Sequence, residues 1–175
     1  MPVLLTTYVQ VGVLDTPEYH SVCDIADRLI EHLNTADVQL LLQQANVPGV
    51  SSALVQATFK PFAEAAGFVD ESRGLFAEYE NSALRPDYFL RLGETGILLE
   101  VERGKTTINN MDLLDFWKCH LCEQANYLFL LVPQELRQNP AMRPKREYNY
   151  VVKRMASFFV RRNYTNVRGL HIFGY

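Results

Sequence analysis

The chain has 175 residues, of which 48% are hydrophobic and 21% are charged, and its formal net charge is -3 at pH 7. This composition is that of an ordinary globular protein and excludes a disordered or collagen-like chain. No apolar run reaches the ~18 residues that cross a bilayer. The first ten residues carry no basic side chain, so we expect no secretory signal and a cytoplasmic location. Three cysteines, Cys23, Cys119 and Cys122, are too few for a disulfide framework, which fits a reducing compartment.

The length suits one domain, and we expect residues 1–175 to form it. Within it we expect an N-terminal helical region at 1–50, a core that carries the site at 51–135, and a basic helix with a final strand at 136–175. The basic side chains are concentrated at this end, because residues 137–175 contain nine Lys and Arg but one Glu. A polyanionic partner would meet this end first. The alternative interpretation is a basic face that only aids solubility.

Helical patterns predominate in the first third of the chain. The expected helices are 17–33, 38–44 and 51–66. Thr16 is suited to cap the first of them and Pro17 to occupy its first position. Apolar residues then recur at helical spacing. Ser51 or Ser52 can cap the third helix, and Gly67 stops it.

The pattern changes to strands after Gly67. The expected strands are 75–80, 87–92, 97–103, 127–132 and 169–173, and the expected helices are 109–123 and 147–163. The run YLFLLV at 127–132 is typical of a strand buried on both faces. In the helix 109–123, Trp117 and His120 are expected to pack on the core face. The order of elements predicts a single-domain α/β/α sandwich around a mixed central sheet.

The most informative stretch is RPDYFLRLGETGILLEVERGK, residues 85–105. Strand side chains alternate between faces, so Glu100 and Glu102 point the same way. If residues 93–96 form a four-residue hairpin loop, Asp87 lies opposite Glu102, and the three carboxylates share one face. Directly opposed Cβ atoms are then about 5 Å apart. A slip of one residue would move Asp87 to the other face.

Three carboxylates at this spacing repel one another unless solvent or a cation relieves the repulsion. The residues around the glutamates are apolar, which favours a divalent cation over a solvated acidic face. Mg²⁺ takes carboxylate oxygens and often a carbonyl. We therefore expect Asp87, Glu100 and the Val101 carbonyl to hold Mg²⁺ or Mn²⁺. Water on the ion could attack a phosphodiester, with Glu102 as general base and Lys105 stabilising charge.

The same residues carry a family resemblance. Pro86 and Asp87, twelve further residues, then Glu100 and Glu102 on either side of a valine resemble the PD-(D/E)xK motif of restriction-endonuclease-like nucleases. The resemblance covers about residues 51–132. It implies a restriction-endonuclease-like fold, with Asp87 and Glu100 as metal ligands on a central β-hairpin. It also implies an Mg²⁺-dependent endonuclease that hydrolyses phosphodiester bonds, with DNA as the expected substrate.

One position departs from the motif. Its third residue is normally Lys, and here it is Glu102, which resembles the branch of type II restriction enzymes in which an acid or amide replaces the lysine. Lys105 is a candidate for a displaced lysine, and Lys118 on the next helix is another. The departure also leaves open a catalytically inactive relative of the same fold that binds nucleic acid or acts as an interaction protein.

The basic C-terminal end supplies the expected contacts to DNA. The candidates for phosphate contacts are Lys145, Arg146, Arg154 and Arg161. Arg154 and Arg161 are seven residues apart and would share one face of the helix 147–163. Tyr148 and Tyr150 lie between basic residues and could stack on bases. Cleavage of both strands of a duplex needs two active sites, so a homodimer is plausible.

A structural zinc site is a third hypothesis. His20 with Cys23, and Cys119 with Cys122, are pairs at helical i, i+3 spacing that could together supply four ligands. The alternative interpretation is that the cysteines are small core residues.

Overall fold

The computed structural model describes residues 1–47, 49–70, 74–77, 79, 84–104, 106–137 and 143–175. The strands are β1 (Leu4–Val9), β2 (Val69–Asp70), β3 (Tyr88–Leu92), β4 (Thr95–Val101), β5 (Tyr127–Val132) and β6 (Gly169–Gly174). The helices are α1 (Pro17–Leu33), α2 (Ala36–Ala45), α3 (Ser52–Ala66), α4 (Met111–Leu121) and α5 (Glu147–Ala156). Short 3-10 turns follow at Val11–Val13 and Ser157–Phe159. Within the described residues, no helix is long and apolar enough to cross a bilayer.

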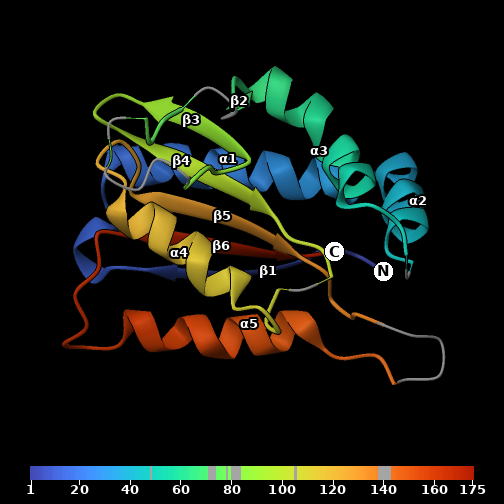
Figure 1. Cartoon of the computed structure of the whole chain (residues 1–175). Coiled ribbons are helices and arrows are strands. Elements are labelled where there is room, and N and C mark those ends of the chain that lie inside the picture. Colours follow the sequence, from blue (N-terminus) through green and yellow to red (C-terminus); the bar gives the residue numbers. More distant parts are fainter. Residues whose placement is uncertain (48, 71–73, 78, 80–83, 105, 138–142) are drawn as a thin grey trace.

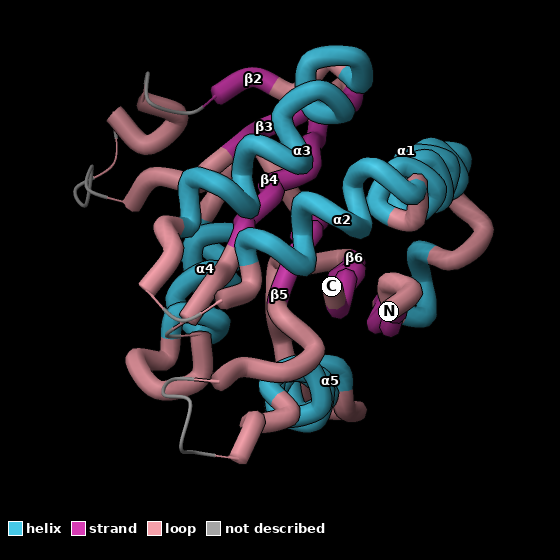
Figure 2. The backbone as a smooth tube through the Cα atoms, turned by 90° about the vertical axis from the view of Figure 1, so that its right-hand side faces the viewer, coloured by secondary structure: helices cyan, strands magenta, loops and turns pink. Residues whose placement is uncertain are grey.

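The six strands form one mixed sheet in the order β1-β6-β5-β4-β3-β2 (Figure 1). The central strands β4, β5 and β6 are parallel. β1 pairs antiparallel with β6, β3 pairs antiparallel with β4, and β2 pairs antiparallel with β3. Helices α1, α2 and α3 cover one face of the sheet, and α4 and α5 cover the other (Figure 2). This confirms the predicted α/β/α sandwich with a mixed central sheet. The carboxyl ends of the parallel strands β4, β5 and β6 lie at the same end of the sheet. In open sheets of this kind, ligands bind at the carboxyl ends of the strands.

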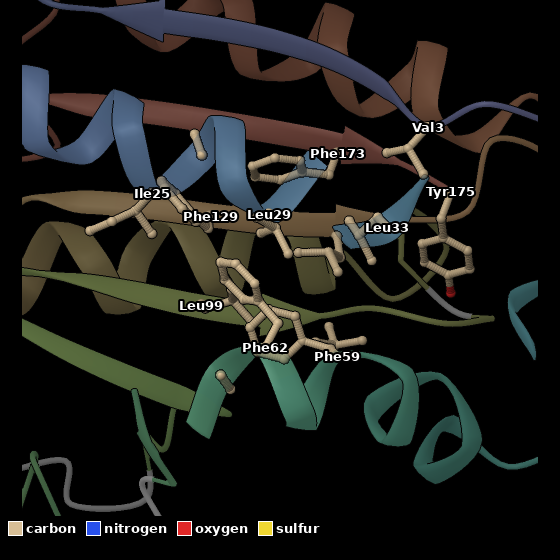
Figure 3. Close-up of a cluster of buried hydrophobic side chains, with 14 of the residues drawn as sticks. Val3, Ile25, Leu29, Leu33, Phe59, Phe62, Leu99, Phe129, Phe173 and Tyr175 are labelled. Carbon is tan, nitrogen blue, oxygen red and sulfur yellow. The ribbon is translucent and has the colours of Figure 1, made fainter. Parts of the chain in front are cut away.

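The hydrophobic core lies in two clusters, one on each face of the sheet. Ile97 and Leu99 of β4 belong to the cluster under α1–α3, whereas Leu98 belongs to the cluster under α4 and α5. Figure 3 shows the first cluster, where Leu99 lies close to Phe59 of α3. All six residues of β5 are fully buried, as its continuous apolar sequence predicts. The period-2 alternation of β4 therefore decides which residues face α4.

The helix boundaries follow from the residues at their ends. The Thr16 hydroxyl accepts a hydrogen bond from the Tyr19 amide, 3.2 Å away, at the start of α1. The Ser51 hydroxyl accepts one from the Ala53 amide at the start of α3. Gly67 ends α3 with a φ of 86°, in the left-handed region that glycine adopts without steric cost. These caps were predicted from the sequence and are confirmed.

Two strands differ from the prediction. β1 adds a strand to the region expected to be helical, and it pairs with β6 from the opposite end of the chain. Its pattern is weak because one face stays partly exposed at the sheet edge. The strand expected at 75–80 is wrong for 75–77, which form a turn, and residues 78 and 80 lie outside the described residues. β2 takes its place beside β3.

Candidate active site

The β3–β4 hairpin sets the positions of the acidic residues. Its turn is Gly93–Glu94, two residues long, so the predicted four-residue loop is wrong. The register therefore differs from the prediction by two residues and brings Asp87 level with Glu100 instead of Glu102. Because side chains repeat with period 2, an even shift keeps all three acids on one face of the sheet. Continued by one residue beyond the paired Tyr88 and Leu99, this register is consistent with the expected common face.

Asp87 is fixed just before β3 by three hydrogen bonds. Its Oδ2 accepts from the Val101 amide at 2.8 Å, and its Oδ1 accepts from Gln56 Nε2 of α3 at 3.1 Å. Its own amide donates to Glu100 Oε2 at 3.3 Å. Burial raises the pKa of Asp87, and the Val101 amide and the charge of Lys118 partly offset this effect. Asp87 therefore links the start of β3 to the carboxyl end of β4.

Lys118 of α4 lies among the acids. Its Nζ is 2.9 Å from Glu100 Oε1 and 2.9 Å from Asp115 Oδ1. All three side chains are buried. Burial opposes the charge of Lys118, but the two carboxylates outweigh it and raise the pKa of the ammonium group. Lys118 is therefore a fixed positive charge beside Glu100. It is one of the two lysines named as candidates to replace the lysine of the motif, and the structure places it next to the acids.

Glu102 and Asp115 form the second half of the site. Burial, followed by the charge of Asp115, raises the pKa of Glu102 to about 8. Burial raises the pKa of Asp115 to about 6, although Lys118 opposes this shift. Asp115 Oδ2 is buried and has no hydrogen-bond partner among the described residues. A side-chain hydrogen bond joins the two carboxyl groups, and it raises the pKa of Glu102 and lowers that of Asp115.

We define the acid cluster as Asp87, Glu100, Glu102 and Asp115 together with Lys118. It contains four carboxyl groups against one ammonium group, and the pKa of every carboxyl group in it is raised, with burial as the largest cause. Glu100 and Asp115 are buried, whereas Asp87 and Glu102 are partly exposed. The cluster is thus open to solvent on the side of Asp87 and Glu102.

The chemistry of this donor set fits a hard divalent cation, which prefers carboxylate and carbonyl oxygens. The excess of carboxylates and the unpartnered Asp115 Oδ2 both favour an added positive charge. The N–H and C=O groups of one strand residue point to the same side, so the Val101 carbonyl faces the same side as its amide, which binds Asp87. Among the described residues, no three acidic, histidine or cysteine side chains already converge to hold an ion. Metal binding therefore remains a proposal.

The exposed and buried residues of helix α4 differ from those expected. Its exposed residues are all apolar, namely Leu114, Trp117 and Leu121. Its charged residues Asp112, Asp115 and Lys118 are buried. The prediction that Trp117 packs on the core face is wrong, because this side chain is 58% exposed. His120 is half-buried, and its Nδ1 accepts a hydrogen bond from the Asn166 amide.

Asp115 was missed at the level of sequence, although a signal was present. Asp112, Asp115 and Lys118 recur at i, i+3 spacing and therefore follow one face of α4. Leu114, Trp117 and Leu121 follow another face and are exposed, although the usual rule buries an apolar face, whereas the apolar Phe116 and Cys119 are buried. Here the charged face is buried, because Glu100 projects from β4 toward α4 and needs a cation.

The remaining predicted site residues have separate positions. Lys105 lies outside the described residues. Arg154 forms an ion pair with Asp112 at 2.9 Å. Arg161 lies beyond the end of α5, so the expected face shared with Arg154 is wrong, because the α-helix ends at Ala156. Lys145 forms an ion pair with Glu147 at 3.1 Å, and Arg146 is exposed.

The structure does not assemble the zinc site. The Cys23 side chain packs against the core cluster under α1–α3, whereas Cys119 and Cys122 belong to the cluster on the other face of the sheet. The sheet therefore separates the two pairs. The interpretation of these cysteines as small core residues is confirmed for Cys119 and Cys122, which are buried.

Comparisons with known proteins agree with this architecture. No family model matches the chain, and no curated protein is similar to it in sequence. Among solved structures, the chain is similar to the restriction endonuclease BglII complexed with a DNA 16-mer. The TM-score is 0.54 at 11% identity, over 99% of this chain and 78% of that one. The likeness shows that this chain has a restriction-endonuclease-like fold.

Proposed function

We propose that this protein is a Mg²⁺- or Mn²⁺-dependent nuclease that hydrolyses phosphodiester bonds in DNA. The observation that carries the proposal is the acid cluster, where four carboxyl groups surround one lysine at the carboxyl end of β4. The restriction-endonuclease-like fold and its neighbour, a restriction endonuclease crystallised with DNA, support the same reaction and substrate. An excess of buried carboxylates costs stability, so a binding role is needed to explain it.

The residues of the acid cluster have distinct roles in this proposal. Asp87, Glu100 and the Val101 carbonyl would hold the cation, which when bound supplies a water of lowered pKa. Lys118 is a fixed positive charge and would stabilise the negative charge that develops on the phosphate. Glu102 is protonated at neutral pH, because its pKa is about 8. It would act as a base only once deprotonated, so cleavage should increase as the pH rises toward 8.

The test is cleavage of a labelled DNA duplex with and without Mg²⁺ or Mn²⁺. We expect Asp87→Ala to reduce cleavage at least about 1000-fold, which corresponds to about 4 kcal/mol of transition-state stabilisation. Glu94→Gln, at the exposed tip of the same hairpin, is the matched control and should cleave as the parent does. Circular dichroism of both variants checks the fold. Cleavage that survives in Asp87→Ala would exclude this site.

A second function is favoured by two observations. Lys118 already neutralises part of the acid cluster through Glu100 and Asp115, and Glu102 stands where the motif has Lys. Both features fit a relative that has lost cleavage and retains nucleic-acid binding. In that case the parent protein binds DNA in a salt-sensitive manner but shows no cleavage at any concentration of Mg²⁺ or Mn²⁺.

The proposal includes a homodimer, because cleavage of both strands of a duplex needs two active sites. We propose the exposed stripe of Leu114, Trp117 and Leu121 on α4 as the contact. A twofold axis brings this uncharged stripe onto itself and leaves no charge unpaired. The opposite face of α4 carries Asp115 and Lys118, so the contact would bring two acid clusters near one another. Sedimentation velocity should show a dimer for the parent and a monomer for Trp117→Glu. A parent that is monomeric with and without DNA excludes the dimer.

A further inference from the structure

A hollow of about 360 Å³ lies at the start of α5, away from the acid cluster. It is lined by Pro144, Lys145, Arg146, Asn149, Tyr150 and Lys153. Three of these side chains are cations, one is an amide and one is a phenol, and none is acidic. The volume is in the range of sites that hold small molecules and is too large for a lone phosphate group. The lining therefore favours an anion that also carries an organic part.

The positive charge of the hollow is largely free. Arg146 and Lys153 are exposed, and no ion pair joins either of them to an acid within the described residues. Lys145 is paired with Glu147, and its Nζ also lies 5.1 Å from the centre of the Tyr150 ring. The Tyr150 side chain is 55% exposed. An aromatic ring among cations matches the chemistry of a nucleotide, whose base can stack and whose phosphate needs cations.

The hollow lies on one helix face, at the end of the sheet where β4 and β5 also end. Arg146, Asn149, Tyr150 and Lys153 follow i, i+3, i+4, i+7 spacing, which places them on one face at the amino end of α5. The Tyr148 amide donates to the Pro133 carbonyl, just after β5. The Glu102 amide likewise donates to Leu131 at the end of β5. Figure 1 shows the start of α5 and the end of β4 at the same end of the sheet.

A loop joins the hollow to the strand of the acid cluster. Glu147 is fully buried and accepts hydrogen bonds from the Thr107 amide at 2.7 Å and from the Thr107 hydroxyl at 2.6 Å. Lys145 also donates to the Thr107 hydroxyl. Thr107 follows Glu102 by five residues, so the side chains that fix the hollow also fix the loop after the acid cluster. These hydrogen bonds connect the hollow to the chain segment that follows the acid cluster.

We infer that the hollow binds one nucleotide of the substrate strand, with its phosphate on Arg146 and Lys153 and its sugar or base against Tyr150. This inference rests on the proposed function for the identity of the substrate. It adds a binding position for the strand outside the site of cleavage. A free nucleoside phosphate offers the same chemistry, and the experiment below distinguishes it from a nucleotide within a strand.

The test measures binding of a fluorescent DNA duplex by anisotropy in EDTA, in an Asp87→Ala background. Cleavage is absent under these conditions, so failure of the nuclease proposal leaves the measurement intact. The double variant Arg146→Gln/Lys153→Gln should bind at least 10-fold more weakly, and the slope of log affinity against log salt should fall by about 1 to 2. The matched control is Arg28→Gln/Lys60→Gln, which removes two charges from the face covered by α1 and α3 and should bind as the background does. Tyr150→Ala should weaken binding, whereas Tyr150→Phe should retain it.

Two results would overturn the inference. Binding of the double variant at the affinity of its background would show that the hollow does not contact the strand. Binding of free dTMP as tightly as the duplex, lost in the double variant, would assign the hollow to a free nucleotide instead. Circular dichroism of each variant checks that the fold is retained.

Discussion

Two buried charge clusters lie on the α4 and α5 side of the sheet, and they are balanced in opposite ways. Glu147 is fully buried. Burial would raise its pKa, but the hydrogen bonds from Thr107 and the charge of Lys145 lower it. In the acid cluster, burial prevails and raises the pKa of each carboxyl group, Glu102 to about 8. A carboxylate with enough donors stabilises the fold, whereas an excess of carboxylates destabilises it and is suited to binding a cation.

Removal of Glu147 tests the balanced cluster and should have the largest effect on stability. Glu147→Ala leaves Lys145 and Thr107 without their partner, and breaking a buried pair costs about 3 kcal/mol or more. We expect this decrease in the free energy of unfolding by urea denaturation at pH 7. Glu94→Ala, on an exposed turn, should change it by less than about 0.5 kcal/mol. A small loss in Glu147→Ala would show that this cluster is not structural.

Removal of a charge from the acid cluster should instead increase the stability of the fold. The pKa of Glu102 is raised from 4.5 to about 8 in the folded state. The folded protein therefore holds more protons than the unfolded chain between these values, and its stability falls as the pH rises through them. The full shift corresponds to about 4 to 5 kcal/mol, and solvent screens about half of it because the Glu102 side chain is partly exposed. Glu102→Gln cannot ionise, so it should be more stable than the parent by about 2 kcal/mol at pH 8 without metal. At pH 5 the two should be nearly equal. Equal stability at both pH values would contradict the raised pKa.

A divalent cation should relieve the same repulsion. At pH 8, Mg²⁺ or Mn²⁺ at ten times its dissociation constant should raise the free energy of unfolding by about 1.4 kcal/mol. Thermal denaturation of the parent with and without the ion measures this shift. Asp87→Ala should lose it, whereas Glu147→Gln should retain it because Glu147 is outside the acid cluster. An equal shift in the parent and in Asp87→Ala would place the ion elsewhere.

His171 offers a buried titratable group whose pKa shift comes from burial alone. Burial lowers its pKa from 6.5 to about 4, and its Nδ1 has no partner among the described residues. Below pH 6.5 the unfolded chain gains a proton that the folded state does not accept, so stability is lost as the pH falls toward 4. His171→Phe fits beside Phe129 and Tyr19. Between pH 7.5 and 5.5, the free energy of unfolding of His171→Phe should fall by about 1 kcal/mol less than that of the parent. Urea denaturation measures both. The same loss in both proteins would exclude His171 as the cause.

Much of the local structure was predictable, because it depends on neighbouring residues. Thr16, Ser51 and Gly67 mark helix ends through bonds within a few residues of themselves. β1 could not be predicted in this way, because its partners in β6 are about 165 residues away. The hairpin turn was placed with an error of two residues, and the shared face of Asp87 and Glu100 survived only because that error was even.

The sequence by itself determined the α/β/α class, the buried central strand and the helix ends, because each follows from a local period or cap. Only the tertiary structure decided that Lys118 and Asp115 join these acids. Helix α4 has one charged face and one apolar face, and its own pattern favours burying the apolar one. Packing against β4 buries Asp115 and Lys118 together with Phe116 and Cys119, places Lys118 2.9 Å from Glu100, and leaves Trp117 exposed.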